Sequence, residues 1–149
     1  DDLTFGDTKE GSFGIRMAPA YRLKGNVAQG SALNSDGVVG NLVWGKRASW
    51  ISYWAPFNDE EIGISIFDHP SNLRHPTWWH ARDYGLVAAN PFGVSNFEGK
   101  PKGTGDLFLE KGEEITFRYR VLFHLGNPKD AEISQRYLDW SKKKERLNN

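Results

Sequence analysis

The sequence predicts an all-β fold, an antiparallel β-sandwich followed by one C-terminal α-helix. Short runs rich in β-branched and aromatic residues alternate with turn residues along most of the chain. Glycine is frequent, with 16 residues, and aromatic residues make up 13% of the chain, which suits a sandwich with long functional loops. Because 149 residues is the usual size of one domain, we expect a single domain over residues 1–149.

The first half of the chain predicts strands separated by clear turns. Residues 13–18 alternate as a strand does, and Pro19 confines the next residues to an edge or a bend. Asn34-Ser35-Asp36-Gly37 is a strong turn signal. Three β-rich runs are predicted as strands, namely 38–44, 48–54 and 61–67. In the last of these, Ile62, Ile64 and Ile66 fall on one face.

The second half begins with a long irregular segment and ends in a helix. Residues 68–82 contain two prolines and three histidines and predict a structured loop or short strand. Residues 84–89 predict a buried strand, and 100–106 predict a loop rich in Gly and Lys. Residues 113–124 give the clearest strand, whose odd-numbered residues from Ile115 to Phe123 are expected on one buried face.

The C-terminal helix is expected over about 128–146. Asn127 can cap its N-terminus and Pro128 suits its first position. Ile133, Tyr137 and Trp140 would form one narrow apolar stripe. We interpret the lysines at 142–144 as cations that complement the helix dipole, in preference to a nucleic-acid or lipid patch, because no second basic cluster accompanies them.

Charge and cysteine content exclude several classes of function. Nineteen basic side chains balance nineteen acidic ones, which argues against a nucleic-acid partner. No stretch reaches the apolar length of a membrane span. Cysteine is absent, which removes thiolate nucleophiles, iron–sulfur clusters and disulfides. The start at Asp1 has the look of a processed chain, which favours a periplasmic or secreted location without establishing one.

Residues 69–84 concentrate titratable and aromatic side chains in one loop. Histidine supplies acid/base chemistry near neutral pH, and Arg74 and Arg82 could clamp a polar group of a substrate. If residues 78–84 are extended, Trp78, His80, Arg82 and Tyr84 share one face. Such an aromatic platform beside His and Arg fits a sugar ring, whose C–H faces stack while its hydroxyls form hydrogen bonds.

Two other interpretations of this loop stay open. His69, His75 and His80 could ligate a metal ion, although their spacing matches no strong zinc motif. The loop could also be purely structural, with His75 and His80 bonded to the backbone and Arg74 and Arg82 paired with Asp68 and Asp83.

A second group of charged residues lies between glycines at positions 6–11. Asp7 and Glu10 could act with a histidine in glycosidic or proton-transfer chemistry. The same residue types are also common in a turn with solvated charges.

Four ordered motifs carry a resemblance to a known family. They are Gly6–Arg16, Trp44–Arg47, His69–Leu86 and Ala89–Gly93. Together they resemble the bacterial family labelled methane oxygenase PmoA-like. We do not carry over the activity in that label, because the methane monooxygenase subunit of that name is a membrane protein and this chain has no apolar span.

The resemblance implies a protein of unknown function that is frequently linked with sugar metabolism. It also implies sheets similar to half of the large β-sandwich of aldose-epimerase-like proteins, a likeness of fold that transfers no reaction. Members of this family are usually about twice as long as this chain. We therefore expect a homodimer or a missing N-terminal half as partner, if the chain is a fragment or a short member.

We predict a carbohydrate-related protein that binds or acts on a sugar by acid/base chemistry and needs no cofactor. The expected catalytic residues are His75, His80 and Glu10. A non-catalytic carbohydrate-binding or assembly module is the alternative, and a metal-dependent enzyme is the third. The expected substrate-binding residues are Arg74, Arg82, Trp78, Trp79, Tyr84 and Asn90.

Overall fold

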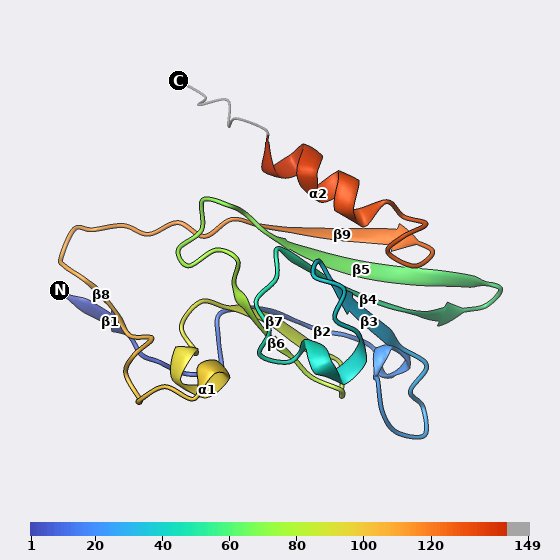
Figure 1. Cartoon of the computed structure of the whole chain (residues 1–149), viewed down its shortest axis with the longest axis horizontal. Coiled ribbons are helices and arrows are strands. Elements are labelled where there is room, and N and C mark those ends of the chain that lie inside the picture. Colours follow the sequence, from blue (N-terminus) through green and yellow to red (C-terminus); the bar gives the residue numbers. More distant parts are fainter. Residues whose placement is uncertain (143–149) are drawn as a thin grey trace.

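The computed structural model describes residues 1–142 and is mostly β, as predicted. The described residues form nine strands in three antiparallel sheets, followed by a C-terminal helix (Figure 1). The two larger sheets face each other across one apolar core, so the arrangement is a β-sandwich.

The larger layer is a four-stranded sheet with the order β3-β4-β5-β9. Its strands are β3 (Ser31–Asn34), β4 (Trp50–Phe57), β5 (Glu60–Asp68) and β9 (Tyr119–Leu125). The turn predicted at residues 34–37 is present. The Asn34 side-chain oxygen accepts hydrogen bonds from the N–H groups of Asp36 and Val38, at 3.0 and 2.9 Å.

The smaller layer is a three-stranded sheet with the order β2-β7-β6. Its strands are β2 (Phe13–Arg16), β7 (Leu86–Asn90) and β6 (Trp78–Ala81). Since side chains alternate across a strand, Trp79 and Ala81 face the core, whereas Trp78 and His80 face outward. Trp79 packs in that core with Ile51, Tyr53 and Ile66 of the other sheet.

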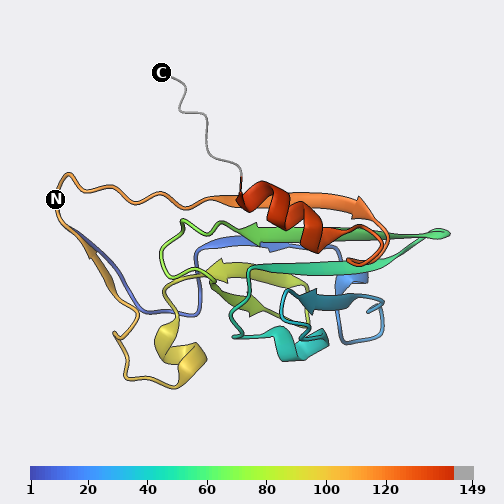
Figure 2. The same ribbon diagram turned by 45° about the horizontal axis from the view of Figure 1, so that its top comes forward.

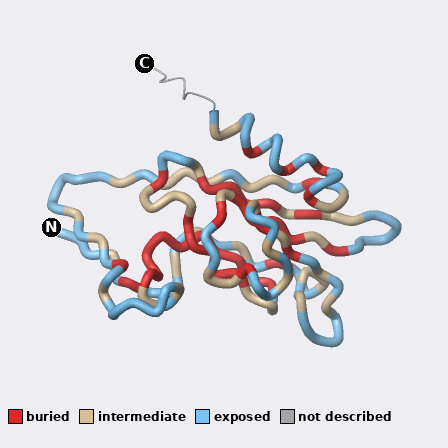
Figure 3. The backbone as a smooth tube through the Cα atoms, in the orientation of Figure 1, coloured by how far each residue is buried: buried red, intermediate tan, exposed pale blue. Residues whose placement is uncertain are grey.

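Two short strands form a separate ribbon at the N-terminal side of the molecule. β1 (Leu3–Phe5) pairs with β8 (Leu107–Leu109), and the chain between β8 and β9 runs along the same side (Figure 1). Three short helices connect the strands, namely η1 (Pro19–Tyr21), η2 (Gly40–Val43) and α1 (Val94–Glu98). Buried residues gather in the two larger sheets, while much of the ribbon is exposed (Figure 3).

The C-terminal helix α2 (Ile133–Ser141) covers the outer face of the four-stranded sheet (Figure 2). Ile133 and Tyr137 pack there against Trp50 and Phe67, as the predicted stripe requires. The helix begins five residues later than expected, because Glu132 adopts a left-handed conformation with φ 52° and interrupts the preceding turn. Its expected continuation to about residue 146, and the lysines at 143 and 144, lie outside the described residues.

Two strand predictions were wrong in part. In the predicted strand 38–44, Gly40–Val43 form η2, since Gly40 has φ 57° and turns the chain out of the extended conformation. The strand predicted over 113–124 starts only at Tyr119, where pairing with β5 begins.

One end of the larger sheet is not covered by the smaller one. Strands β4, β5 and β9 have seven to nine residues, whereas those of the smaller sheet have four or five. Phe123 was predicted to be buried and is 69% exposed, and Phe57 and Leu125 on the same face of the sheet are also exposed. The apolar face of this sheet therefore extends beyond the core.

Candidate functional site

The segment between β1 and β2 separates two neighbouring cavities. One has a volume of about 440 Å³ and is mostly apolar; the other, of about 450 Å³, is polar. Both volumes lie in the range of small-molecule sites. Thr8 and Glu10 line both cavities, so Glu10 can contact a ligand that occupies either one.

Aromatic rings form much of the apolar cavity, which we call the aromatic cavity. Phe5 of β1 stacks on Phe92 with ring centroids 5.2 Å apart, and Phe117 meets Phe92 edge to face at 5.8 Å. Ser12, Thr8 and Glu10 supply polar atoms at its wall. This combination of flat apolar surfaces with a few hydrogen-bonding groups suits a ring that has apolar faces and polar edges.

Lysine side chains surround the polar cavity, which we call the lysine cavity. Lys9 comes from the 6–12 segment, while Lys100 and Lys102 come from the loop after α1. The Lys9 ammonium lies 4.0 Å from the Glu10 carboxylate. No carboxylate of the described chain lies within ion-pair distance of Lys100 or Lys102.

Asp7 holds these segments together. Its carboxylate accepts hydrogen bonds from the backbone N–H groups of Ser95 and Gly105, and its own N–H donates to Asp106. Burial raises the pKa of Asp7, but these N–H donors outweigh burial and the net pKa is lowered. Asp7 is therefore a charged structural residue that fixes the loop carrying Glu10.

His80 lies on the outer face of the smaller sheet, in register with Ala88 and Gly14. These small neighbours leave its ring to be covered by Trp44 and Phe97, whose centroids lie 6.4 and 6.3 Å away. The residue is 3% exposed, and its Nδ1 atom has no hydrogen-bond partner. His80 is thus buried next to the site, with an unused polar atom.

Charged residues of the site act on His80 electrostatically. Burial lowers the pKa of His80, the Glu10 carboxylate opposes this shift, and Arg82 and Lys9 reinforce it. The fold therefore couples His80 electrostatically to Glu10 and Arg82. All three were predicted from the sequence as candidate site residues, although Glu10 lies 70 residues before His80.

The lowered pKa of His80 predicts a pH-dependent stability. Below the ordinary His pKa of 6.5, the unfolded chain binds a proton before folded His80 does, so the free energy of unfolding falls as the pH drops from about 7 toward the folded pKa. His80→Gln should weaken this dependence in urea unfolding measured from pH 7.5 to 5. Burial also lowers the pKa of His124, so part of the pH dependence should remain in His80→Gln. An unchanged dependence of the free energy of unfolding on pH in this variant would show that His80 does not cause it.

Arg82 and Tyr84 line neither of the two cavities beside Glu10. Arg82 and Trp44 line a smaller cavity of about 190 Å³ together with Asn41. The strand predicted from Tyr84 starts only at Leu86, because Gly85 turns the chain with φ 87°. The Tyr84 ring is flanked by the guanidinium groups of Arg16 and Arg82, at 5.0 and 5.4 Å from its centroid.

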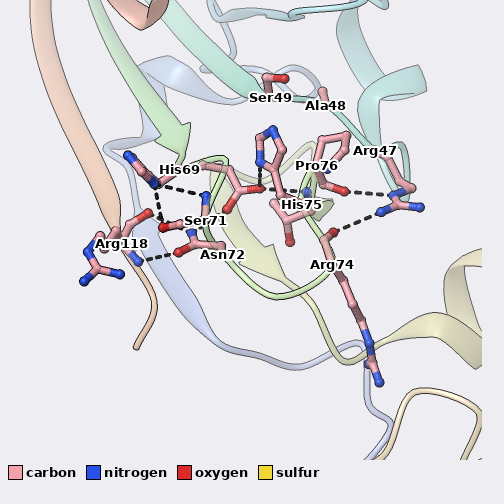
Figure 4. A network of polar contacts seen from close by, with 12 residues as sticks. Arg47, Ala48, Ser49, His69, Ser71, Asn72, Arg74, His75, Pro76 and Arg118 are labelled. Carbon is pink, nitrogen blue, oxygen red and sulfur yellow. Dashed lines mark hydrogen bonds and ion pairs between the residues drawn. The ribbon is translucent and has the colours of Figure 1, made fainter. Parts of the chain in front are cut away.

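His75 belongs to a different network, centred on Asp68 (Figure 4). The buried Asp68 carboxylate accepts hydrogen bonds from His75 Nδ1 at 2.7 Å, from the Thr77 N–H at 2.9 Å and from the Asn72 side chain at 2.7 Å. His75 Nε2 lies 3.4 Å from the Tyr137 hydroxyl on α2. The network thereby ties the 69–77 loop to the C-terminal helix.

Arg74 and Arg47 reinforce this loop from its other side. In Figure 4, the Arg74 side chain points away from His75, and its guanidinium donates to the carbonyls of Pro91, Gly105 and Asp106. Arg47 donates to the Arg74 and Pro76 carbonyls. The purely structural interpretation of this loop paired Arg74 with Asp68, whereas Arg74 binds carbonyl acceptors.

Three of the expected substrate-binding residues are structural in this fold. Trp79 is fully buried, and its Nε1 atom donates to the Ala48 carbonyl at 2.9 Å. Trp78 is 5% exposed and covered by the Arg47 guanidinium. Asn90 is buried and bonds to the backbone of Thr8, Phe92 and Gly93. None of these side chains offers a free face to a sugar.

The three histidines of the metal hypothesis do not come together. His69 bonds to Ser71, His75 to Asp68, and His80 packs among aromatic rings. Across residues 1–142, no three His, Cys, Asp or Glu side chains are grouped so that they could hold a metal ion. His124 lies apart from them and bonds to Ser65 and to the Gly126 carbonyl.

Several site residues carry no signal that the sequence alone reveals. The aromatic wall combines Phe5, Phe92 and Phe117, which are separated by as many as 112 positions, so no local pattern marks them. Phe97 lies on a helix of five residues that was not predicted. For Lys100 and Lys102, the local signal is the composition of the loop 100–106, which is rich in Gly and Lys.

Comparison with protein families gives one assignment. Residues 1–138 match the model of a family of unknown function, DUF6807. The chain belongs to this family. No curated protein and no solved structure matches the chain significantly. Within residues 1–142, no helix of this DUF6807 member is long and apolar enough to cross a membrane.

Proposed function

We propose that this DUF6807 protein binds a sugar or sugar derivative in the aromatic cavity and exchanges a proton with it through Glu10. The observation that carries the proposal is the position of Glu10 at the wall of a cavity built from aromatic rings. Apolar C–H faces of a sugar would lie against Phe92 and Phe117, and its hydroxyls would bond to Thr8, Ser12 and Glu10.

We assign proton transfer to Glu10 alone, whereas the sequence predicts His75, His80 and Glu10 as catalytic residues. Its side chain is 63% exposed and meets solvent and both cavities. Neither His75 nor His80 lines the cavities described above. His80 is linked to this residue electrostatically, because the Glu10 carboxylate opposes the lowering of the His80 pKa by burial.

A non-catalytic module for carbohydrate binding or assembly is the second candidate. Two observations favour it: His75 is engaged with Asp68, and the exposed Phe57, Phe123 and Leu125 extend the apolar face of the larger sheet beyond its cover. The resemblance to PmoA-like bacterial proteins linked with sugar metabolism supports the carbohydrate part of both candidates.

Hydrogen–deuterium exchange on sugars separates these two functions even while the product is unidentified. Neutral and anionic monosaccharides are incubated with the protein in D₂O, and proton NMR follows C–H exchange and interconversion of anomers. Imidazole signals of His80 are recorded in the same samples. We expect at least one sugar to shift the His80 titration and to exchange faster than without protein.

Each other outcome has a definite meaning. A sugar that shifts His80 without faster exchange would assign the module in place of the enzyme. A His80 titration that is identical with and without every sugar tested, together with no exchange, would overturn the carbohydrate proposal.

A further inference from the structure

The two cavities beside Glu10 differ in chemistry and share a wall. Aromatic residues line the aromatic cavity, whereas three lysines and Asn96 are among the residues that line the lysine cavity. Thr8 and Glu10 belong to both. A single ligand that reaches over this wall would meet apolar surface at one end and positive charge at the other.

Most of the negative charge in the lysine cavity is already engaged. The Asp7 carboxylate is buried and faces the N–H groups of Ser95 and Gly105. Glu10 offsets Lys9, which lies 4.0 Å away. Lys100 and Lys102 have no carboxylate of the described chain at ion-pair distance, so their charges are available to a ligand.

We propose that the sugar recognised at Glu10 is anionic, with its phosphate or carboxylate group in the lysine cavity and its ring in the aromatic cavity. This inference rests on the proposed function and narrows its substrate class. Ammonium groups from two different segments can approach one anionic group from two sides, and a phosphate or carboxylate accepts several such hydrogen bonds. Glu10 then lies between the anionic group and the ring.

The first experiment tests the anion subsite without any sugar. Inorganic phosphate is titrated into the protein while amide NMR signals of Ser95 and Asn96 are followed. We expect millimolar phosphate to shift these signals in the wild type and not in the double variant K100Q/K102Q. The matched control K46Q/K111Q removes two exposed lysines outside the cavity and should respond as the wild type does.

The second experiment compares a neutral sugar with its anionic forms. Affinities for glucose, glucose 6-phosphate and glucuronate are measured at low salt. We expect the preferred anionic form to bind about tenfold more tightly than glucose, as two exposed charge contacts allow. K100Q/K102Q should remove most of this advantage and leave the affinity for glucose unchanged. The two anionic forms decide between a phosphate and a carboxylate.

The outcomes separate this inference from the proposed function. Equal affinity for glucose and both anionic forms would overturn the anionic substrate and leave the sugar site intact. Equal phosphate shifts in K100Q/K102Q and wild type would also overturn it. Phosphate binding without binding of any sugar would overturn both proposals and leave an adventitious ion only.

Discussion

Replacing Glu10 by glutamine is expected to slow proton exchange on the bound sugar by about 10²–10⁴-fold, the usual contribution of a positioned acid or base. The amide has nearly the same size and still forms hydrogen bonds, but it cannot accept a proton at neutral pH. The affinity for the sugar should therefore change far less than the rate. Because the Glu10 side chain is 63% exposed, the free energy of unfolding should change little.

The same variant has a readout that does not require turnover. The Glu10 carboxylate raises the pKa of His80 against the effect of burial. Its removal should lower that pKa further, which a titration of the His80 imidazole by NMR would detect. Glu60→Gln is the matched control, since Glu60 is an exposed residue at the start of β5. Unchanged exchange in Glu10→Gln would remove Glu10 from the mechanism.

Replacing Asp68 by alanine is expected to destabilise the fold by about 3–5 kcal/mol, the cost of removing one partner from a buried polar pair. Three donors lose their acceptor at once, namely the His75 ring, the Thr77 N–H and the Asn72 side chain. The loss also breaks the connection between the 69–77 loop and Tyr137 on α2. Urea unfolding followed by tryptophan fluorescence measures the change.

Two further variants make the Asp68 result interpretable. Asp68→Asn keeps one carbonyl acceptor and should lose less stability than Asp68→Ala. Asp36→Ala removes an exposed turn aspartate that accepts the Ser35 hydroxyl, and should change stability by less than about 1 kcal/mol. If Asp68→Ala behaves like Asp36→Ala, the network is not what holds the loop.

Local chemistry explains which elements the sequence could predict. Asn34 makes its turn with its own side chain, so four neighbouring residues contain the whole signal. The helix start at Ile133 depends on the left-handed conformation of Glu132, a residue type that does not favour it. Phe123 fits a strand pattern, but its exposure depends on how far the smaller sheet extends over it. The sequence of β9 does not show the length of the strands in that sheet.

The residue types of the candidate site can be read from the sequence, whereas the positions of their side chains cannot. Glu10, His80 and Arg82 stand out by residue type, and the fold couples them electrostatically. Trp79 and Asn90 also stand out by type, yet the pleat directs Trp79 into the core and backbone groups engage Asn90. Which residue of a polar and aromatic run faces a ligand is decided by strand pairing between distant segments.

The pairing of the N-terminal strands also determines when the site can form during synthesis. Leu3 pairs with Leu109, and Phe13 pairs with Ala89, so the segment that carries Glu10 is anchored at both ends by chain made 76 or more residues later. Such non-local contacts form slowly, because the chain must close large loops first. The segment that carries Glu10 is therefore anchored at both ends only once β8 has emerged from the ribosome, and shorter chains lack the second anchor.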